Sequence, residues 1–115
     1  MRGSRLSVNK ALRLLKEAEE DLRIGCYDKA VSSAYFSVRM MAELYLKDAK
    51  TRKDDKLANA LGRKLGDEVR KEFLFLFEMR KEADHRDKIF SQSEADKILR
   101  RAKRIFNVLL DLLQE

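Results

Sequence analysis

Apolar residues recur every three or four positions through most of the chain, which is the spacing of one face of an α-helix. This pattern predicts a first helix from about Ser7 to Ile24, ended by a left-handed cap at Gly25. A second helix is predicted from about Asp28, as its N-cap, to about Asp48. Because each of these helices carries an apolar stripe, we expect both to pack against one core.

A third long helix is predicted to start near Asp67, and it contains an unusually apolar run, Phe73-Leu74-Phe75-Leu76-Phe77. A single strand of this composition would have no partner strands, so a helix that is buried on all sides is favoured. Such a helix needs two surfaces to bury against. One is the core of the bundle, and we expect the other to be a second copy of the chain.

The last helix is predicted to begin at Ser91 or Ser93, since Ser91-x-x-Glu94 has the spacing of a capping box. Its opposite face is basic, and its apolar residues form one continuous seam: Ile98, Leu99, Ala102, Ile105, Phe106, Leu109, Leu112 and Leu113. Residues 48–66 have the weakest pattern, with one short helix around Leu57–Leu61. We interpret them as a connection within one domain that spans residues 1–115. Long helices and short connections predict an all-α, antiparallel up-and-down bundle of four to five helices.

Composition narrows the class of protein. The 115 residues include no proline, which agrees with a helical chain because proline breaks helix interiors. A single cysteine excludes a disulfide framework, and one cysteine with one histidine cannot complete a zinc site within the chain. No apolar run approaches the roughly 20 residues of a membrane span. We therefore expect a cytoplasmic protein without membrane contact.

The charge balance is mildly basic, with 26 Lys and Arg against 20 Asp and Glu. A net charge of +6 is compatible with a polyanionic partner such as RNA, and equally with a surface that is simply soluble. The basic face of the last helix has the same two interpretations, since a run of charges on a helix is usually its solvated face.

The only histidine, His85, lies in a polar segment that follows the apolar run. Glu82-x-x-His85 matches one element of a di-iron bundle, but a chain with one histidine cannot supply the second element. Alternatively, Arg80 and His85 act together, which requires the helix to end near residues 83–85 because five helical residues turn about 500°. Arg80 and Asp84 are also spaced to form an ordinary surface ion pair, with His85 as a helix-end residue.

Together these features resemble a HEPN domain (higher eukaryotes and prokaryotes nucleotide-binding), in particular the small prokaryotic members with a single domain. The similarity spans roughly residues 8 to 113. It rests on three segments in order: Ala18…Leu22-x-x-Gly25-x-Tyr27-x-x-Ala30 leading into Ser33-Ala34-Tyr35-Phe36; Arg80-x-x-Ala83-Asp84-His85; and Ser93-Glu94-Ala95 with Ala102 and Phe106.

The resemblance implies a helical bundle that dimerises. Many active members carry an Arg-x4–6-His motif and act as metal-independent ribonucleases, often as toxins paired with a nucleotidyltransferase antitoxin. Arg80 and His85 match this motif with four residues between them. By this resemblance Arg80 would bind the scissile phosphate and His85 would act as general acid and base, with no metal and no cofactor.

Three further basic residues are candidates for binding a nucleotide or nucleic acid: Arg39, Lys81 and Arg86. Arg39 could point into a cleft near Arg80 or extend its charged end to solvent. Active relatives usually have Asn, Asp or His where Lys81 stands. Asp87 replaces the tyrosine that is adenylylated in antitoxin-linked members, so that regulation is not expected. The alternative function is a non-catalytic module that binds a nucleotide, a nucleic acid or a partner nucleotidyltransferase, and a third is helical assembly without a ligand.

Overall fold

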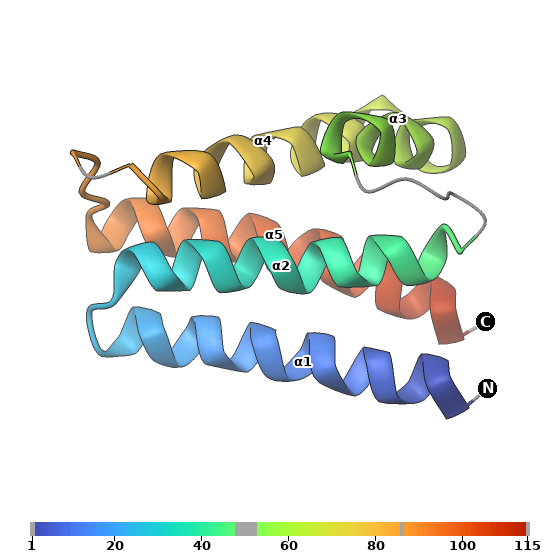
Figure 1. Ribbon diagram of the computed structural model, residues 1–115, viewed down its shortest axis with the longest axis horizontal. Helices are drawn as coiled ribbons and strands as arrows, with labels where there is room; N and C mark the ends of the chain where they lie inside the picture. The colour runs from blue at the N-terminus through green and yellow to red at the C-terminus, as the bar shows by residue number, and fades with distance from the viewer. Residues whose placement is uncertain (1, 48–52, 86, 115) are drawn as a thin grey trace.

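The computed structural model describes residues 2–47, 53–85 and 87–114, with side chains described from Ser7 onward. All regular secondary structure in these ranges is helical, so the predicted all-α fold is confirmed (Figure 1). The five helices are α1 (Arg2–Arg23), α2 (Tyr27–Tyr45), α3 (Asp54–Leu65), α4 (Asp67–Ala83) and α5 (Gln92–Gln114).

The turn between α1 and α2 follows the predicted pattern at its start and departs from it at its end. Gly25 has a φ of 88°, the left-handed region that glycine enters at little cost, as expected of a helix cap. The prediction that Asp28 is the N-cap of the second helix is wrong. The helix begins at Tyr27 after Cys26, whose side chain makes no capping hydrogen bond, and Asp28 lies in the first turn. There its negative charge interacts favourably with the positive end of the helix dipole. The predicted end near Asp48 lies outside the described residues.

α3 is longer than the short helix predicted around Leu57–Leu61. It occupies 12 residues and buries four of them, Leu57, Ala58, Ala60 and Leu61. Gly66, with a φ of 104°, is both the C-cap of α3 and the N-cap of α4. The two helices therefore join with no intervening loop, and α3 is part of the bundle as well as a connection.

The apolar run in α4 is only partly buried within one chain. Phe73 and Leu76 face the core, whereas Leu74, Phe75 and Phe77 are half-buried. The expectation of a helix buried on all sides is therefore met on one face only. The half-buried side chains still pack against the core cluster at its edge.

α5 confirms its predicted start. The amide of Glu94 donates to Oγ of Ser91 at 3.1 Å, and the amide of Ser91 donates to Oε1 of Glu94 at 3.0 Å. The hydrogen bond from the Ser91 amide also holds the pKa of Glu94 below its ordinary value. Most of the predicted seam is buried: Ile98, Leu99, Ala102, Ile105, Phe106 and Leu109. Leu112 and Leu113 are half-buried.

α2 is the central helix, because it packs against each of the other four. The bundle measures 38 × 26 × 20 Å, so its length is close to that of its longest helices. α1 begins and α5 ends at one end of the bundle, while the α1–α2 turn and the α4–α5 connection lie at the other (Figure 1). None of the described helices is long and apolar enough to span a membrane.

Candidate functional site

Arg80 lies in the last turn of α4 and extends its side chain over two aromatic rings of α2. Its guanidinium carbon, Cζ, is 5.2 Å from the ring centroid of Phe36 and 6.0 Å from that of Tyr35. A cation over an aromatic face is attracted by the negative charge of the ring. The side chain is 32% exposed, so the rings hold the guanidinium at the surface without enclosing it.

The polar contacts of Arg80 leave part of its binding capacity unused. Nε lies 3.5 Å from Oδ2 of Asp84, which is the ion pair that the i,i+4 spacing predicts. Nε is nevertheless buried, and it makes no hydrogen bond within the described part of the chain. A guanidinium carries five donors in a planar fork that matches a carboxylate or a phosphate. Because Nε is buried, a further anion would bind Arg80 through the part of the guanidinium that remains exposed.

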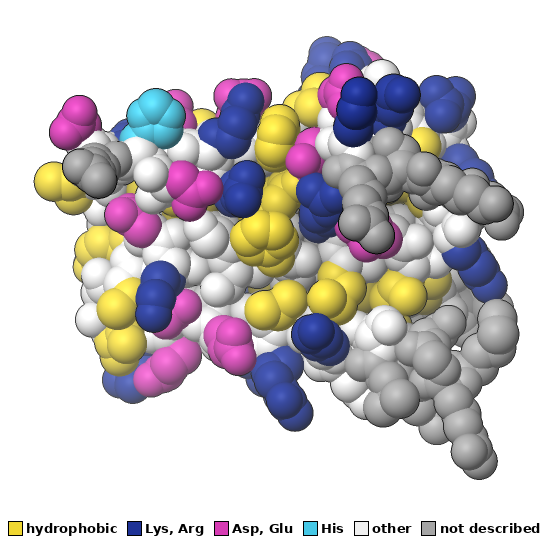
Figure 2. Space-filling model, viewed as in Figure 1, with side chains coloured by type: hydrophobic (Ala, Val, Ile, Leu, Met, Phe, Trp, Pro, Cys, Tyr) yellow, Lys and Arg dark blue, Asp and Glu magenta, His cyan; other side chains and the backbone are white. Residues whose placement is uncertain are grey.

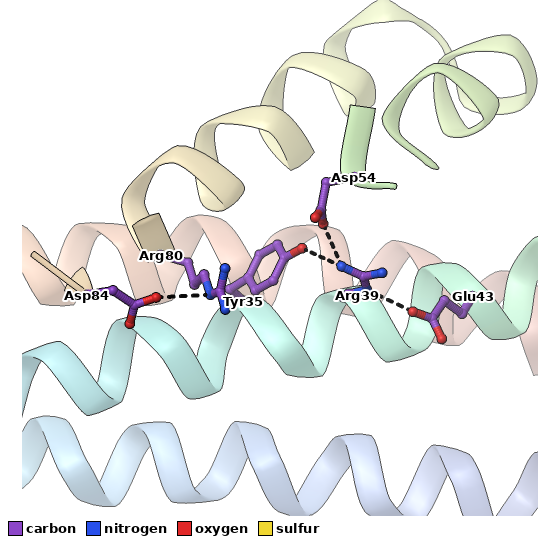
Figure 3. Close-up of polar contacts among 6 residues, drawn as sticks. All are labelled: Tyr35, Arg39, Glu43, Asp54, Arg80 and Asp84. Atoms are coloured by element: carbon purple, nitrogen blue, oxygen red, sulfur yellow. Dashed lines mark hydrogen bonds and ion pairs between the residues drawn. The ribbon is translucent and has the colours of Figure 1, made fainter. Parts of the chain in front are cut away.

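A second arginine, Arg39 on α2, lies on the other side of Tyr35 from Arg80 and is bound by acidic side chains. Arg39 donates from Nη1 to Oδ1 of Asp54 at 2.9 Å and from Nε to Oε1 of Glu43 at 2.8 Å. Nη1 also donates to the hydroxyl of Tyr35 at 3.3 Å, and the Tyr35 ring lies between the two arginines (Figure 3). Because Asp54 begins α3, this ion pair attaches α3 to α2.

Two positive charges, those of Arg39 and Arg80, lie near the carboxyl of Asp54. Burial raises the pKa of its carboxyl above the ordinary aspartate value, and the positive charge of Arg80 opposes that shift. The ion pair with Arg39 also favours the carboxylate form of Asp54. One carboxylate therefore lies in the field of both arginines.

His85 lies just beyond the end of α4, with an exposed side chain on the surface drawn in Figure 2. Its amide donates to the carbonyl of Glu82 at 3.0 Å, and its carbonyl accepts from the amide of Lys88 at 3.3 Å. The first of these bonds spans three residues, so it closes a tighter turn than that of an α-helix at the end of α4. The end of the helix at Ala83 meets the condition under which Arg80 and His85 can approach one substrate, although the described residues show no hydrogen bond between the two.

The other predicted residues have separate surroundings. The Lys81 ammonium lies 2.9 Å from Glu78 and 4.7 Å from the ring centroid of Phe77, with its side chain exposed. Arg39 does not extend freely into solvent, because its guanidinium is turned toward Asp54. Arg86 lies outside the described residues.

Two residues of this site were missed from the sequence. Phe36 is a 40% exposed aromatic beside Arg80, and in the sequence it was noted only as part of a segment that resembles HEPN domains. Asp54 lies in the segment of weakest pattern, 26 residues before Arg80 in the chain. The only local signal for it was its place in front of a short apolar stretch, as an acidic residue in the first turn of a helix.

The arrangement offers anion binding and proton transfer. Arg80 provides the cation, and His85 provides an exposed imidazole, a group that can donate or accept a proton. Among the residues that the structure describes, no three of His, Cys, Asp and Glu are grouped so that they could hold a metal ion.

Comparison with known proteins extends these observations to a family. The family model of the HEPN domain matches residues 4–112, which include all five helices in whole or in large part, and both Arg80 and His85. No curated protein matches the chain. Because the family match covers nearly the whole sequence and the structure is a helical bundle, this chain belongs to the HEPN domain family.

Proposed function

We propose that this HEPN domain protein is a metal-independent endoribonuclease that acts as a homodimer and that its activity is toxin-like. In this proposal Arg80 binds the scissile phosphate and His85 acts as general acid and base. The observation that carries it is the state of Arg80, a partly exposed guanidinium held on Phe36 and Tyr35, whose one ion-pair partner among the described residues is Asp84. The exposed imidazole of His85 follows directly after the helix that presents Arg80.

The reaction uses a nucleophile that RNA itself contains. His85 accepts the proton of the 2′-hydroxyl, and the 2′-oxygen attacks the adjacent phosphorus. The bond from phosphorus to the 5′-oxygen breaks, the leaving oxygen takes a proton, and a 2′,3′-cyclic phosphate remains. Arg80 binds the phosphate and neutralises the charge that develops on it. Lys81, with its exposed ammonium, would contact a neighbouring phosphate.

A dimer explains how one histidine per chain serves two roles. One imidazole cannot donate and accept a proton at the same moment, whereas two related copies supply both an acid and a base. Phe36, Met40 and Leu44 follow one another at i,i+4 spacing on α2, and Figure 2 shows a row of hydrophobic side chains over this helix. Because Arg80 lies over Phe36, a second copy that covers this row would bring both Arg80 side chains to one interface.

A second candidate is a non-catalytic module that binds a nucleotide, a nucleic acid or a partner nucleotidyltransferase at the same surface. The observation that favours it is the carboxylate of Asp84, 3.5 Å from Nε of Arg80. That carboxylate already occupies one side of the guanidinium, so an incoming phosphate would have to displace it or bind beside it. Binding without cleavage is the outcome that this candidate predicts.

The test is cleavage of a mixed-sequence RNA in excess chelator by wild type, His85→Ala and Arg80→Ala, each shown to be folded and of wild-type oligomeric state. We expect 2′,3′-cyclic phosphate ends, with cleavage reduced at least about 100-fold in both variants. Arg13→Ala removes an exposed arginine of α1 and should cleave like wild type. Full activity in His85→Ala would exclude the proposed chemistry, and RNA binding without cleavage by wild type would favour the second candidate.

A further inference from the structure

A cavity of about 370 Å³ lies between α4 and α5, apart from the site at Arg80. Three apolar side chains that line it are Phe75 and Met79 from α4 and Ile98 from α5. Its volume lies within the range of pockets that bind small molecules. Met79 and Arg80 are consecutive on α4, yet Met79 lines this cavity while Arg80 lies against α2.

The edge of the cavity is basic. Lys97, Arg101 and Arg104 follow at helical spacing on α5 and all line it. Arg101 is already engaged, because it donates from Nε to Glu72 at 2.9 Å and its Cζ lies 3.5 Å from the ring centroid of Phe75. Lys97 and Arg104 are exposed and make no ion pair with any described residue, although the charge of Arg104 acts at longer range on Glu72, the partner of Arg101.

The one carboxylate at the cavity does not neutralise these cations. Glu94 accepts from the amide of Ser91 at 3.0 Å and lies 3.4 Å from the ammonium of Lys88, so it is used at the start of α5. An apolar floor beside two unpaired cations is complementary to a molecule with an apolar body and a single anionic end.

We infer that this cavity binds a small amphiphilic organic anion. An alkyl or aryl body packs on Phe75, Met79 and Ile98, and a carboxylate, sulfonate or phosphate contacts Lys97 and Arg104. The apolar lining of the cavity favours such a molecule over an RNA chain, because Phe75, Met79 and Ile98 offer no hydrogen-bonding groups to a base. The inference does not depend on the proposed ribonuclease activity.

The test titrates the full chain with anilinonaphthalene sulfonate, followed by fluorescence, and then displaces this probe with decanoate. We expect one probe per chain and affinity weakened about tenfold in the double variant Lys97→Gln, Arg104→Gln. The double variant Arg13→Gln, Lys16→Gln removes two exposed cations from α1 and is the matched control for net charge. It should bind like wild type, and the neutral probe phenylnaphthylamine should bind all three proteins equally.

A second variant separates the cavity from its charges. Met79→Trp fills the space and leaves the cations in place, so it should abolish binding of both probes in a protein whose circular dichroism is unchanged. Equal affinity in the Lys97 and Arg104 double variant and in wild type would overturn the inference. So would equal losses in the α1 control, or probe binding that persists in Met79→Trp. Displacement of the probe by RNA and not by decanoate would assign the surface to nucleic acid instead.

Discussion

Asp84 competes with any anion for Arg80. Its carboxylate lies 3.5 Å from Nε, and both side chains are partly exposed. We predict that Asp84→Asn strengthens RNA binding, measured by anisotropy in a His85→Ala background that prevents cleavage, because the guanidinium loses a competing negative charge. Asp87→Asn, a neighbouring exposed aspartate, makes the same change in net charge. If both variants bind equally, overall charge and not the Arg80 contact accounts for the effect.

Arg39 is predicted to contribute to stability through its contact with α3. Its side chain and that of Asp54 are 19% and 13% exposed, so their ion pair is shielded from water. Arg39→Ala leaves Asp54 buried without this partner and should lower the free energy of unfolding by about 2 kcal/mol, measured by urea denaturation.

Arg23→Ala is the matched control for that measurement, because it removes an ion pair with Glu20 that is largely exposed on α1. Its effect should be much the smaller of the two. Equal losses in the two variants would mean that the Arg39–Asp54 contact adds nothing beyond an ordinary surface pair.

At the scale of elements, Glu72 and Arg101 join α4 to α5. Hydrogen bonding to Arg101 lowers the pKa of Glu72 below the ordinary glutamate value of 4.5. At a pH between 4.5 and the lowered pKa, Glu72 binds more protons in the unfolded chain than in the folded protein. The stability that this pair contributes is therefore fully present above about pH 4.5 and is lost as the pH falls through the lowered pKa. Glu72→Gln should therefore reduce the drop in melting temperature between about pH 6 and pH 3.

The same variant should be less stable than wild type near neutral pH by at most about 1 kcal/mol, since the pair is partly exposed. Glu68→Gln changes an exposed carboxylate on the same helix and should keep the wild-type dependence on pH. If the melting temperature of Glu72→Gln falls as much between these pH values as that of wild type, the role assigned to this pair is contradicted.

The long helices could be predicted because their apolar residues continue for four or more turns. α5 is the clearest case, since Ser91 and Glu94 mark its start and a continuous seam fixes its face. α3 could not be predicted in full. Its apolar residues span barely more than one turn between charged residues, and the junction with α4 depends on a single glycine, Gly66.

The candidate site could be predicted only where its members are close in sequence. Arg80, Asp84 and His85 fall within six positions, so the i,i+4 pair could be predicted from spacing, whereas the helix end was only the condition for Arg80 and His85 to act together. Phe36 and Asp54 reach Arg80 through the packing of α2, α3 and α4, and no local pattern encodes that packing.

At the scale of the whole molecule, the apolar row on α2 predicts an association that one substitution can disrupt. Phe36, the first residue of this row, is 40% exposed, and the guanidinium of Arg80 lies over its ring. Phe36→Glu should convert a dimer into a monomer in sedimentation velocity while leaving the helical circular dichroism unchanged, because it replaces an apolar ring by a carboxylate whose desolvation at an interface is costly even beside Arg80.

Val108→Glu provides the matched control for this experiment. Val108 is 43% exposed on α5, so the substitution places the same charge at an equally accessible apolar position. It should leave the dimer intact. A wild-type protein that sediments as a monomer, or a Phe36→Glu variant that still dimerises, would contradict the assignment of the α2 row as the interface.

The arrangement of the helix ends has a practical consequence for tethering this protein. α1 begins and α5 ends at one end of the bundle, and the connection that carries His85 lies at the opposite end (Figure 1). A linker, a fluorophore or a surface attachment at either terminus therefore leaves the His85 end facing solution. Single-molecule measurements on immobilised chains can in this way present the candidate site to a ligand in a uniform orientation.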